Sequence, residues 1–196
     1  KIGQNNPYIT LENIEIRNFY IGVFVDTGSD YCVINSCLIK TCVNAAIFAR
    51  FNDYFSVYNS ILLDGDFGIV GQNIKNISIV NNTIFSSNKI ATNRSEVQAC
   101  LFLSLADEFG NGIIDSGNAW IRNNIFYNVS QYAAVFYMDD LSRGSIDSDY
   151  NNYYTNSDKF ILILEEGTTS TSEEFNSLQL YRQQFDIERN STSINP

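Results

Sequence analysis

The chain has 196 residues, a length that suits one domain, and 44% of them are hydrophobic, as expected for a globular protein. Its formal net charge is −10 and its pI is near 4.3, which argues against nucleic acid or anionic lipid as a partner. No apolar run is long enough to span a bilayer, so we expect no membrane insertion.

A repeat of 23 residues organises the first part of the chain. At this spacing, Leu11, Ile34, Val57 and Val80 form an apolar column. A polar column and a second apolar column keep the same period: Asn13, Ser36, Asn59 and Asn82, then Ile16, Ile39, Leu62 and Phe85. A period of this size indicates stacked repeats, each unable to bury its apolar face alone.

The repeats read as strands. Their apolar residues alternate or come in short β-branched runs that Asn, Gly, Asp and Ser interrupt, and nothing recurs at helical spacing. The leucine-rich consensus is absent. The pattern apolar-x-Asn-Asn/Ser-x-apolar, as around Asn59 and Asn82, resembles the right-handed parallel β-helix of the pectate-lyase-like superfamily over roughly residues 8–155. The resemblance implies an all-β fold of about six coils and is nearly uninformative about activity.

The polar column predicts a sharp turn between the second and third strands of each coil. Asn tolerates φ > 0 better than other non-glycine residues and bonds locally. Since stacked strands lie about 4.8 Å apart, we expect the side-chain amides of Asn59 and Asn82 to form a ladder. Asn123 and Asn151 would continue it.

The fourth coil departs from the period, taking 41 residues from Ile77 to Asn118. The excess forms two insertions, at 87–99 and 106–117, on either side of a strand expected at 101–105. Insertions into repeat proteins collect on the binding face, although loops also tolerate neutral insertions cheaply. We expect these two to wall a groove.

Enzymes of the superfamily that the chain resembles typically cleave acidic polysaccharides, by β-elimination with Arg or Lys as base and often Ca²⁺, or by hydrolysis with grouped Asp residues. The candidate catalytic residues facing this groove are Asp26, Arg50, Asp139 and Asp140. The candidate carbohydrate-binding residues are Gln72, Asp107, Glu108 and Tyr137. The plainer alternatives are a surface ion pair for Asp26 with Arg50 and a solvated turn at Asp139 and Asp140.

Three further features allow two interpretations each. Asp64 and Asp66, in an Asp-Gly-Asp turn, are the candidate Ca²⁺ ligands, but no dedicated calcium loop surrounds them. The column of Tyr8, Tyr31 and Tyr54 suits either sugar stacking or packing between coils. Strand alternation turns an apolar stripe outward, which the insertions, the C-terminal segment or another subunit should cover. Its members are Phe24, Ile47, Val70, Phe102 and Val135.

The four cysteines are Cys32, Cys37, Cys42 and Cys100. They show no CxxC spacing, and His is absent, so we expect no zinc site. Two interpretations remain: the thiols fill small apolar slots, or some of them form a disulfide whose pairing the sequence does not choose.

The period fades after the coils of residues 1–155. Residues 156–196 should form a strand at 160–164 and a capping helix, which a capping box at Thr171-Ser-Glu-Glu174 would open. That helix has an apolar stripe of Phe175, Leu178, Tyr181 and Phe185. Both ends of the chain lie close to predicted elements, so we expect a piece of a larger secreted β-helix protein, with its other domains or subunits as partners.

Two functions fit these observations. The first is an extracellular or cell-surface module directed at polysaccharide, part of a polysaccharide lyase or glycoside hydrolase-like protein; the insertions and the acidic charge favour it. The second is a non-catalytic surface or scaffold protein such as an adhesin, which the lack of a convincing catalytic set favours.

Overall fold

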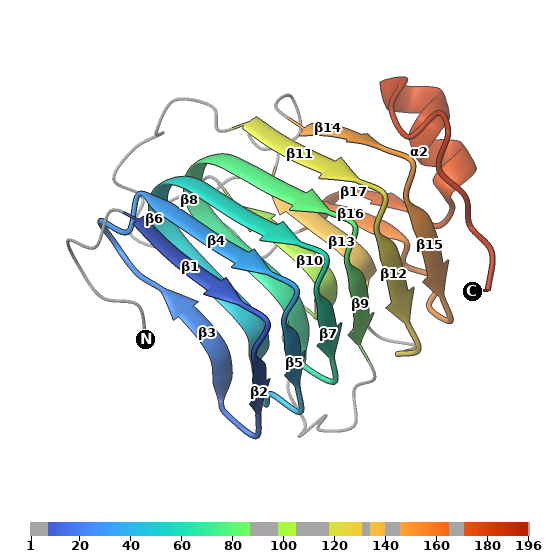
Figure 1. Cartoon of the computed structure of the whole chain (residues 1–196). Helices are drawn as coiled ribbons and strands as arrows, with labels where there is room; N and C mark the ends of the chain where they lie inside the picture. The colour runs from blue at the N-terminus through green and yellow to red at the C-terminus, as the bar shows by residue number, and fades with distance from the viewer. Residues whose placement is uncertain are drawn as a thin grey trace.

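The computed structural model describes residues 8–86, 98–104, 118–130, 134–139, 146–164 and 171–195. Its strands stack in parallel rungs along one long axis (Figure 1). Each coil places one strand on each of three faces, and from β2 to β15 the chain winds about five turns. The predicted parallel β-helix is therefore confirmed.

Face 3 is a separate six-stranded sheet with one strand from each coil. Its strands are β2 (Glu15–Arg17), β5 (Leu38–Lys40), β7 (Ile61–Leu63), β9 (Thr83–Ser86), β12 (Ile125–Asn128) and β15 (Asn152–Thr155).

Faces 1 and 2 belong to one 11-stranded sheet, because β6 (Ala45–Tyr58) and β8 (Phe67–Val80) run through the corner between them. Face 2 comprises β1 (Tyr8–Glu12), β4 (Tyr31–Asn35), the second halves of β6 and β8, β11 (Asn118–Arg122) and β14 (Ile146–Asp149). Face 1 comprises β3 (Ile21–Val25), the first halves of β6 and β8, β10 (Ala99–Ser104), β13 (Ala134–Asp139) and β16 (Ile161–Leu164).

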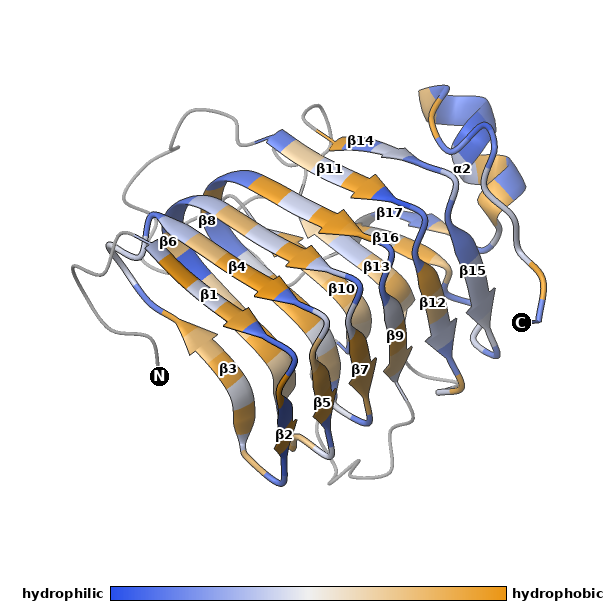
Figure 2. Ribbon diagram, viewed as in Figure 1, coloured by the Kyte–Doolittle hydropathy of each residue, from blue (hydrophilic) through white to orange (hydrophobic). Residues whose placement is uncertain are grey.

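Apolar columns fill the space between the faces, and Figure 2 shows how hydrophobic positions recur from rung to rung. One column runs in register through Leu11, Ile34, Val57, Ile79 and Ile121, and the last four are fully buried. Burial of aliphatic side chains in such columns is the main stabilising contribution of a stacked-repeat fold.

The 23-residue period is wrong after the third coil. From Lys40 to Ala45 the chain takes five steps between face 3 and face 1, but the equivalent corner from Leu63 to Phe67 takes four. All later residues therefore shift by one position. Val80 lies opposite Tyr58 on the outside of face 2 rather than in the core.

The corner between faces 2 and 3 uses the predicted left-handed backbone. Its φ angle lies between 50° and 59° in every coil, at Asn13, Ser36, Asn59, Asn81, Asn123 and Tyr150. The predicted ladder, however, merged two columns. Asn59 bonds outward to Asn35, Nδ2 to Oδ1 at 3.0 Å, whereas the buried ladder runs one residue further on, through Ser60, Asn82, Asn124 and Asn151.

In the buried ladder, each asparagine side chain satisfies backbone groups of the preceding coil. The Asn82 N–H donates to Asn124 Oδ1 at 2.9 Å, and the Asn124 N–H donates to Asn151 Oδ1 at 2.9 Å. The Asn124 amide also donates to the Ile79 carbonyl at 2.8 Å. The column thereby pairs corner N–H groups that would be costly to bury alone.

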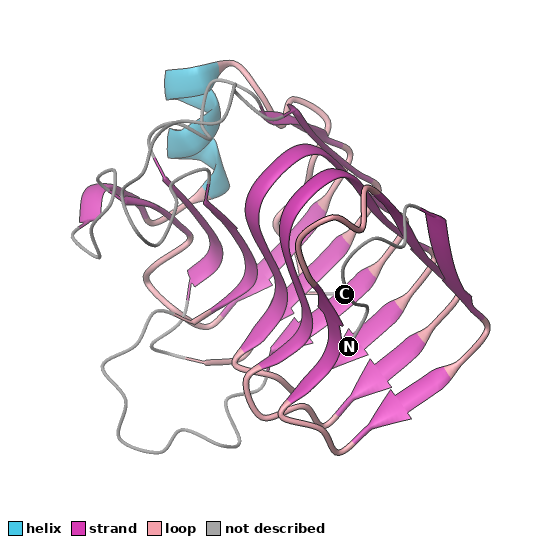
Figure 3. Cartoon of the chain, turned by 90° about the vertical axis from the view of Figure 1, so that its left-hand side faces the viewer, coloured by secondary structure: helices cyan, strands magenta, loops and turns pink. Residues whose placement is uncertain are grey.

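The C-terminal segment lies at the end of the coil opposite β1 and β3 (Figure 1), and Figure 3 views the coil from the β3 end. The predicted capping box is wrong, because β17 (Thr171–Phe175) pairs antiparallel with β16 and takes those residues into a strand. Helix α2 (Leu178–Phe185) begins instead at its N-cap, Ser177. No helix within the described ranges has the length and apolar character to cross a bilayer.

The tail after α2 returns to the last coil and ends the ladder. The Asn151 N–H donates to Ser191 Oγ at 2.7 Å, and Thr192 forms a parallel bridge with Asn152. Glu188 is 1% exposed, and its carboxylate accepts hydrogen bonds from the hydroxyl groups of Tyr153 and Ser191. The tail therefore supplies for the last coil the partners that a further coil would supply.

The four cysteines fill interior slots, as one of the two interpretations predicted. All are buried with free thiols. Burial raises the pKa of the Cys32 and Cys100 thiols to about 12.

We predict that Asn124→Ala lowers the free energy of unfolding by about 3 kcal/mol. Its loss leaves the buried Asn82 N–H and Ile79 carbonyl without partners, and each such group costs about 1–3 kcal/mol. Urea denaturation measures the change. The matched control is the adjacent exposed Asn123→Gly, at φ 56°, which should cost at most a few tenths of a kcal/mol; equal losses in the two variants would contradict the ladder's role.

Alkaline pH should destabilise the fold through the buried thiols. An unfolded Cys ionises near pH 8.5, whereas the folded pKa of Cys100 is about 12. The folded state therefore binds more protons, and stability falls as pH rises above roughly 8.5. Between about pH 9 and 10, below the titration of unfolded Tyr, Cys100→Ala should show a shallower fall in unfolding free energy than the wild type. Parallel pH profiles would refute this.

Candidate functional site

The structure brings three of the candidate residues together on face 1. Arg50 Nε donates to Asp26 Oδ1 at 3.0 Å, and the guanidinium lies 5.3 Å from the centre of the Phe24 ring. Gln72 pairs in register with Arg50 on the next rung. Asp26 is only 6% exposed. Asp26 and Arg50 therefore form an ion pair, the plainer of the two alternatives for these residues.

The other predicted groove residues do not extend this cluster in the part of the chain that the structure describes. Asp107, Glu108 and Asp140 lie outside the described residues, as do most of the first insertion and all of the second. Asp139 ends β13, and its side chain is also outside the description.

Tyr137 is buried rather than facing a groove. It is 5% exposed, and burial, with the nearby charge of Glu174, raises its pKa to about 12. It belongs to the outward row of face 1, whose members in register are Phe24, Phe48, Val70, Phe102 and Tyr137. Val70 is 3% exposed, so this row is covered at its centre.

Two members of the predicted apolar stripe, Ile47 and Val135, were assigned to the wrong side. Both are fully buried in the core. The reason is the bend into face 1, where Ala46 and Ile47 both point inward and the alternation restarts. Gly22 and Gly68 stand at the same bend, where a Cβ atom would collide with a core side chain and a backbone carbonyl.

The candidate calcium pair occupies a structural corner. Asp64 has φ 59°, and its N–H donates to the Phe85 carbonyl at 3.1 Å. Asp66 accepts a hydrogen bond from Gln98 Nε2 at 3.4 Å. Among the described residues, no three His, Cys, Asp or Glu side chains gather in a way that could hold a metal ion.

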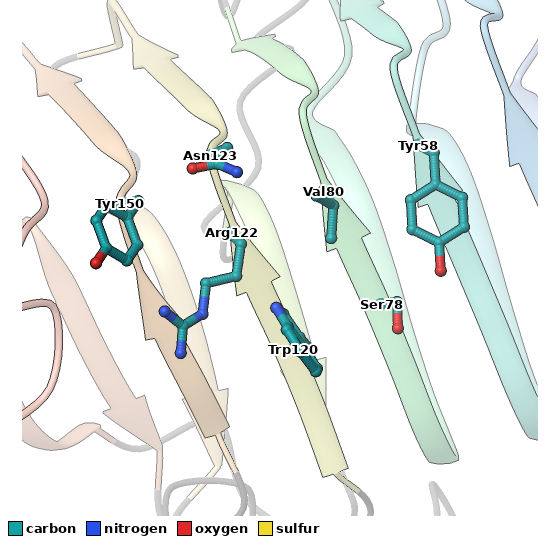
Figure 4. Close-up of a pocket in the computed structure, with 7 residues that line it drawn as sticks. All are labelled: Tyr58, Ser78, Val80, Trp120, Arg122, Asn123 and Tyr150. Carbon is teal, nitrogen blue, oxygen red and sulfur yellow. The ribbon is translucent and has the colours of Figure 1, made fainter.

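Face 2 carries a groove that the sequence interpretation missed (Figure 4). Its volume is about 510 Å³, and its lining residues come from consecutive coils: Tyr58, Ser78, Val80, Trp120, Arg122, Asn123 and Tyr150. Ser78 and Val80 project from β8 as a low floor. Tyr58 stands opposite Val80 on β6, and Trp120 stands opposite Ser78 on β11. Larger side chains on both neighbouring strands thus form the walls.

Arg122 connects the two aromatic residues at one end of the groove. Its guanidinium carbon lies 5.8 Å from the Trp120 ring centre and 5.7 Å from the Tyr150 ring centre, which are cation–π distances. The same guanidinium bonds to the Asp147 carboxylate and lies 3.9 Å from that of Asp149. Arg122 is therefore held by charge and by aromatic contacts together.

Asp149 remains ionised beside the groove. Burial alone would raise its pKa, but hydrogen bonds from the backbone and side chain of Asn190 and from the Tyr150 N–H, with the charge of Arg122, lower it below the ordinary value. A catalytic proton donor needs the opposite shift. Asp149 therefore lacks the shift that a proton donor needs.

The aromatic rings of face 2 fall into two kinds. Tyr8, Tyr31 and Tyr54 stack on one another with ring centres 4.9 and 4.7 Å apart, which is the contact between coils that the packing interpretation predicted. Trp120 and Tyr150 are 56% and 55% exposed, and each has Arg122 as its ring contact. Of the two kinds, only Trp120 and Tyr150 line the groove.

Tyr150 occupies the left-handed corner at φ 59°, where the preceding coils have Asn or Ser. A bulky residue in this conformation costs of order 1 kcal/mol or more, and such strain concentrates at functional sites. Its ring lines the groove. A role for the Tyr150 ring in the groove would account for a strained tyrosine at this corner.

A family model described as a right-handed β-helix region matches residues 2–176. The chain belongs to this family, which agrees with the coil, the three faces and the resemblance noted in the sequence. A search of curated proteins and a search of solved structures each found no match.

We predict that Tyr150→Asn raises the free energy of unfolding by about 0.5–1 kcal/mol, since Asn adopts φ > 0 more readily. Thermal or urea unfolding measures it. Tyr154→Asn is the matched control, because Tyr154 lies in β15 and stacks on Tyr127 at 4.8 Å; it should destabilise. A loss in Tyr150→Asn as large as in the control would show that the tyrosine serves stability.

Proposed function

We propose that this chain is a carbohydrate-binding β-helix module of the cell surface or extracellular space, and that the face 2 groove holds the sugar chain. The exposed rings of Trp120 and Tyr150 on a rigid sheet carry the proposal. Aromatic rings bury the apolar faces of sugars, while nearby polar groups bind the hydroxyls and fix orientation. Asn123 and Ser78 supply such groups.

The ligand runs parallel to the coil axis, across the strands. The lining residues Tyr58, Val80, Arg122 and Tyr150 stand on four consecutive coils. Three strand spacings make a length of roughly 14 Å, since neighbouring strands lie about 4.8 Å apart. This extent fits a short stretch of a polysaccharide rather than a single sugar.

Binding without cleavage is the function that the described residues support best. On face 1 Asp26 and Arg50 bond to each other, and on face 2 the pKa of Asp149 is lowered. A lyase needs a free base and a hydrolase needs a protonated carboxyl group. We therefore favour a non-catalytic surface protein that adheres to polysaccharide over a lyase or a hydrolase.

Trp120 is the sole tryptophan of the chain, so intrinsic tryptophan fluorescence reports directly on the groove. We expect a saturable change in Trp120 emission when hexasaccharides are added, with burial of the ring from water. Collisional quenching by iodide should decrease in parallel. Absence of any change with neutral, acidic and amino-sugar hexasaccharides would refute the proposal.

Tyr58→Ala removes one wall and should weaken binding about tenfold, equivalent to about 1.4 kcal/mol, with Trp120 still present as the reporter. The matched control is Tyr54→Ala, on the same strand and face but within the tyrosine stack. It should leave the affinity within about twofold of the wild type. Equal weakening in both variants would place the site elsewhere on face 2.

A further inference from the structure

We infer that the groove selects uncharged sugars, so that its ligand is a neutral polysaccharide and not an acidic one. The inference rests on the proposed function, because it concerns the same groove. It is carried by the charges of the lining residues and by the state of the one arginine among them.

Six of the seven lining residues are uncharged at neutral pH: Tyr58, Ser78, Val80, Trp120, Asn123 and Tyr150. Their polar groups are hydroxyls, an amide and an indole N–H, which bond to sugar hydroxyls without requiring a charge. Val80 and the rings provide the apolar contact.

The positive charge of Arg122, the remaining lining residue, is already balanced by two carboxylates of the chain. Its guanidinium bonds to the Asp147 carboxylate, with Asp149 3.9 Å away. Its Nε atom is buried without a hydrogen-bond partner and is closed to a ligand. A sugar carboxylate would have to displace Asp147, and the Asp147 charge would then repel it.

The surrounding surface reinforces this selection. The outward rows of the face 2 strands carry Glu12, Asp147 and Asp149 against Arg122, that is three negative charges and one positive, a balance of −2. The whole chain is also acidic, at −10. Approach of a polyanion is therefore opposed, whereas a neutral chain is unaffected.

The test is a Trp120 fluorescence titration of the whole chain with three neutral hexasaccharides (cellohexaose, mannohexaose and xylohexaose), with hexagalacturonate and with hexaglucosamine. We expect at least one neutral sugar to bind at least about tenfold more tightly than hexagalacturonate. Raising NaCl from about 0.1 M to about 1 M shortens the Debye length from roughly 10 Å to roughly 3 Å, and the neutral affinity should change less than about twofold.

Two variants separate the charge effect from simple damage. Asp147→Asn releases Arg122 from its partner, so hexagalacturonate should bind more tightly than to the wild type while the neutral affinity stays within about twofold. Asp53→Asn is the control: it removes the same charge from β6, where Asp53 pairs with Lys75 at 2.8 Å, and should alter neither affinity.

Each outcome discriminates. A preference of the wild type for hexagalacturonate or hexaglucosamine over every neutral sugar would overturn the inference and leave the proposed function intact. An unchanged hexagalacturonate affinity in Asp147→Asn would also overturn it. Silence of Trp120 toward all five sugars would refute the proposed function itself.

Discussion

The buried side-chain ladder at the corner between faces 2 and 3 is the interaction on which the rest of the structure depends. A coil that turns sharply must bury corner N–H groups beside an apolar core, and each would cost free energy if left unpaired. The side chains of Asn82, Asn124 and Asn151 each bond to an N–H and a carbonyl of the preceding coil. Because every amide bonds to its neighbour, the ladder also fixes the register of the coils. At its end, Ser191 in the tail bonds to the Asn151 N–H, as a further coil would.

Because the register is fixed, the outward side chains of face 2 stand in rows, and their sizes determine where its surface is hollow. Opposed positions hold Tyr58, Val80 and Arg122, so the small residue leaves a hollow between larger ones. Tyr150 closes the series with a ring held in a strained backbone conformation. Natural proteins break local rules mainly where function requires it, and this corner breaks the rule that the other coils follow.

The periodicity of the sequence is sufficient to predict the parallel β-helix, because the apolar columns and the turn-forming asparagines recur even though the exact period varies by one residue. Two adjacent asparagines, as at Asn123 and Asn124, cannot be told apart in sequence, so the exposed turn residue and the buried ladder residue were merged. The sequence also gives no sign that the corner from Leu63 to Phe67 is one residue shorter than the corner before it. A constant 23-residue period therefore predicts Val80 in the core, although it lies on the outside of face 2. Since Val80 is part of the groove floor, this error in the period kept the groove from being predicted. The sequence identifies charged candidate residues, but it does not show which contacts they make in the fold, such as that of Asp66 with Gln98.

Our proposal places the sugar chain over β8, between Tyr58 and Trp120. Two-dimensional NMR with ¹⁵N-labelled protein and a neutral hexasaccharide tests it most directly, because the single indole N–H of Trp120 gives one resolved signal. We predict shifts of that signal and of amides in the outer rows of β8 and β11, with Arg50 and Asp26 on face 1 unperturbed. Shifts centred on Arg50 and Asp26, with Trp120 unchanged, would contradict the account.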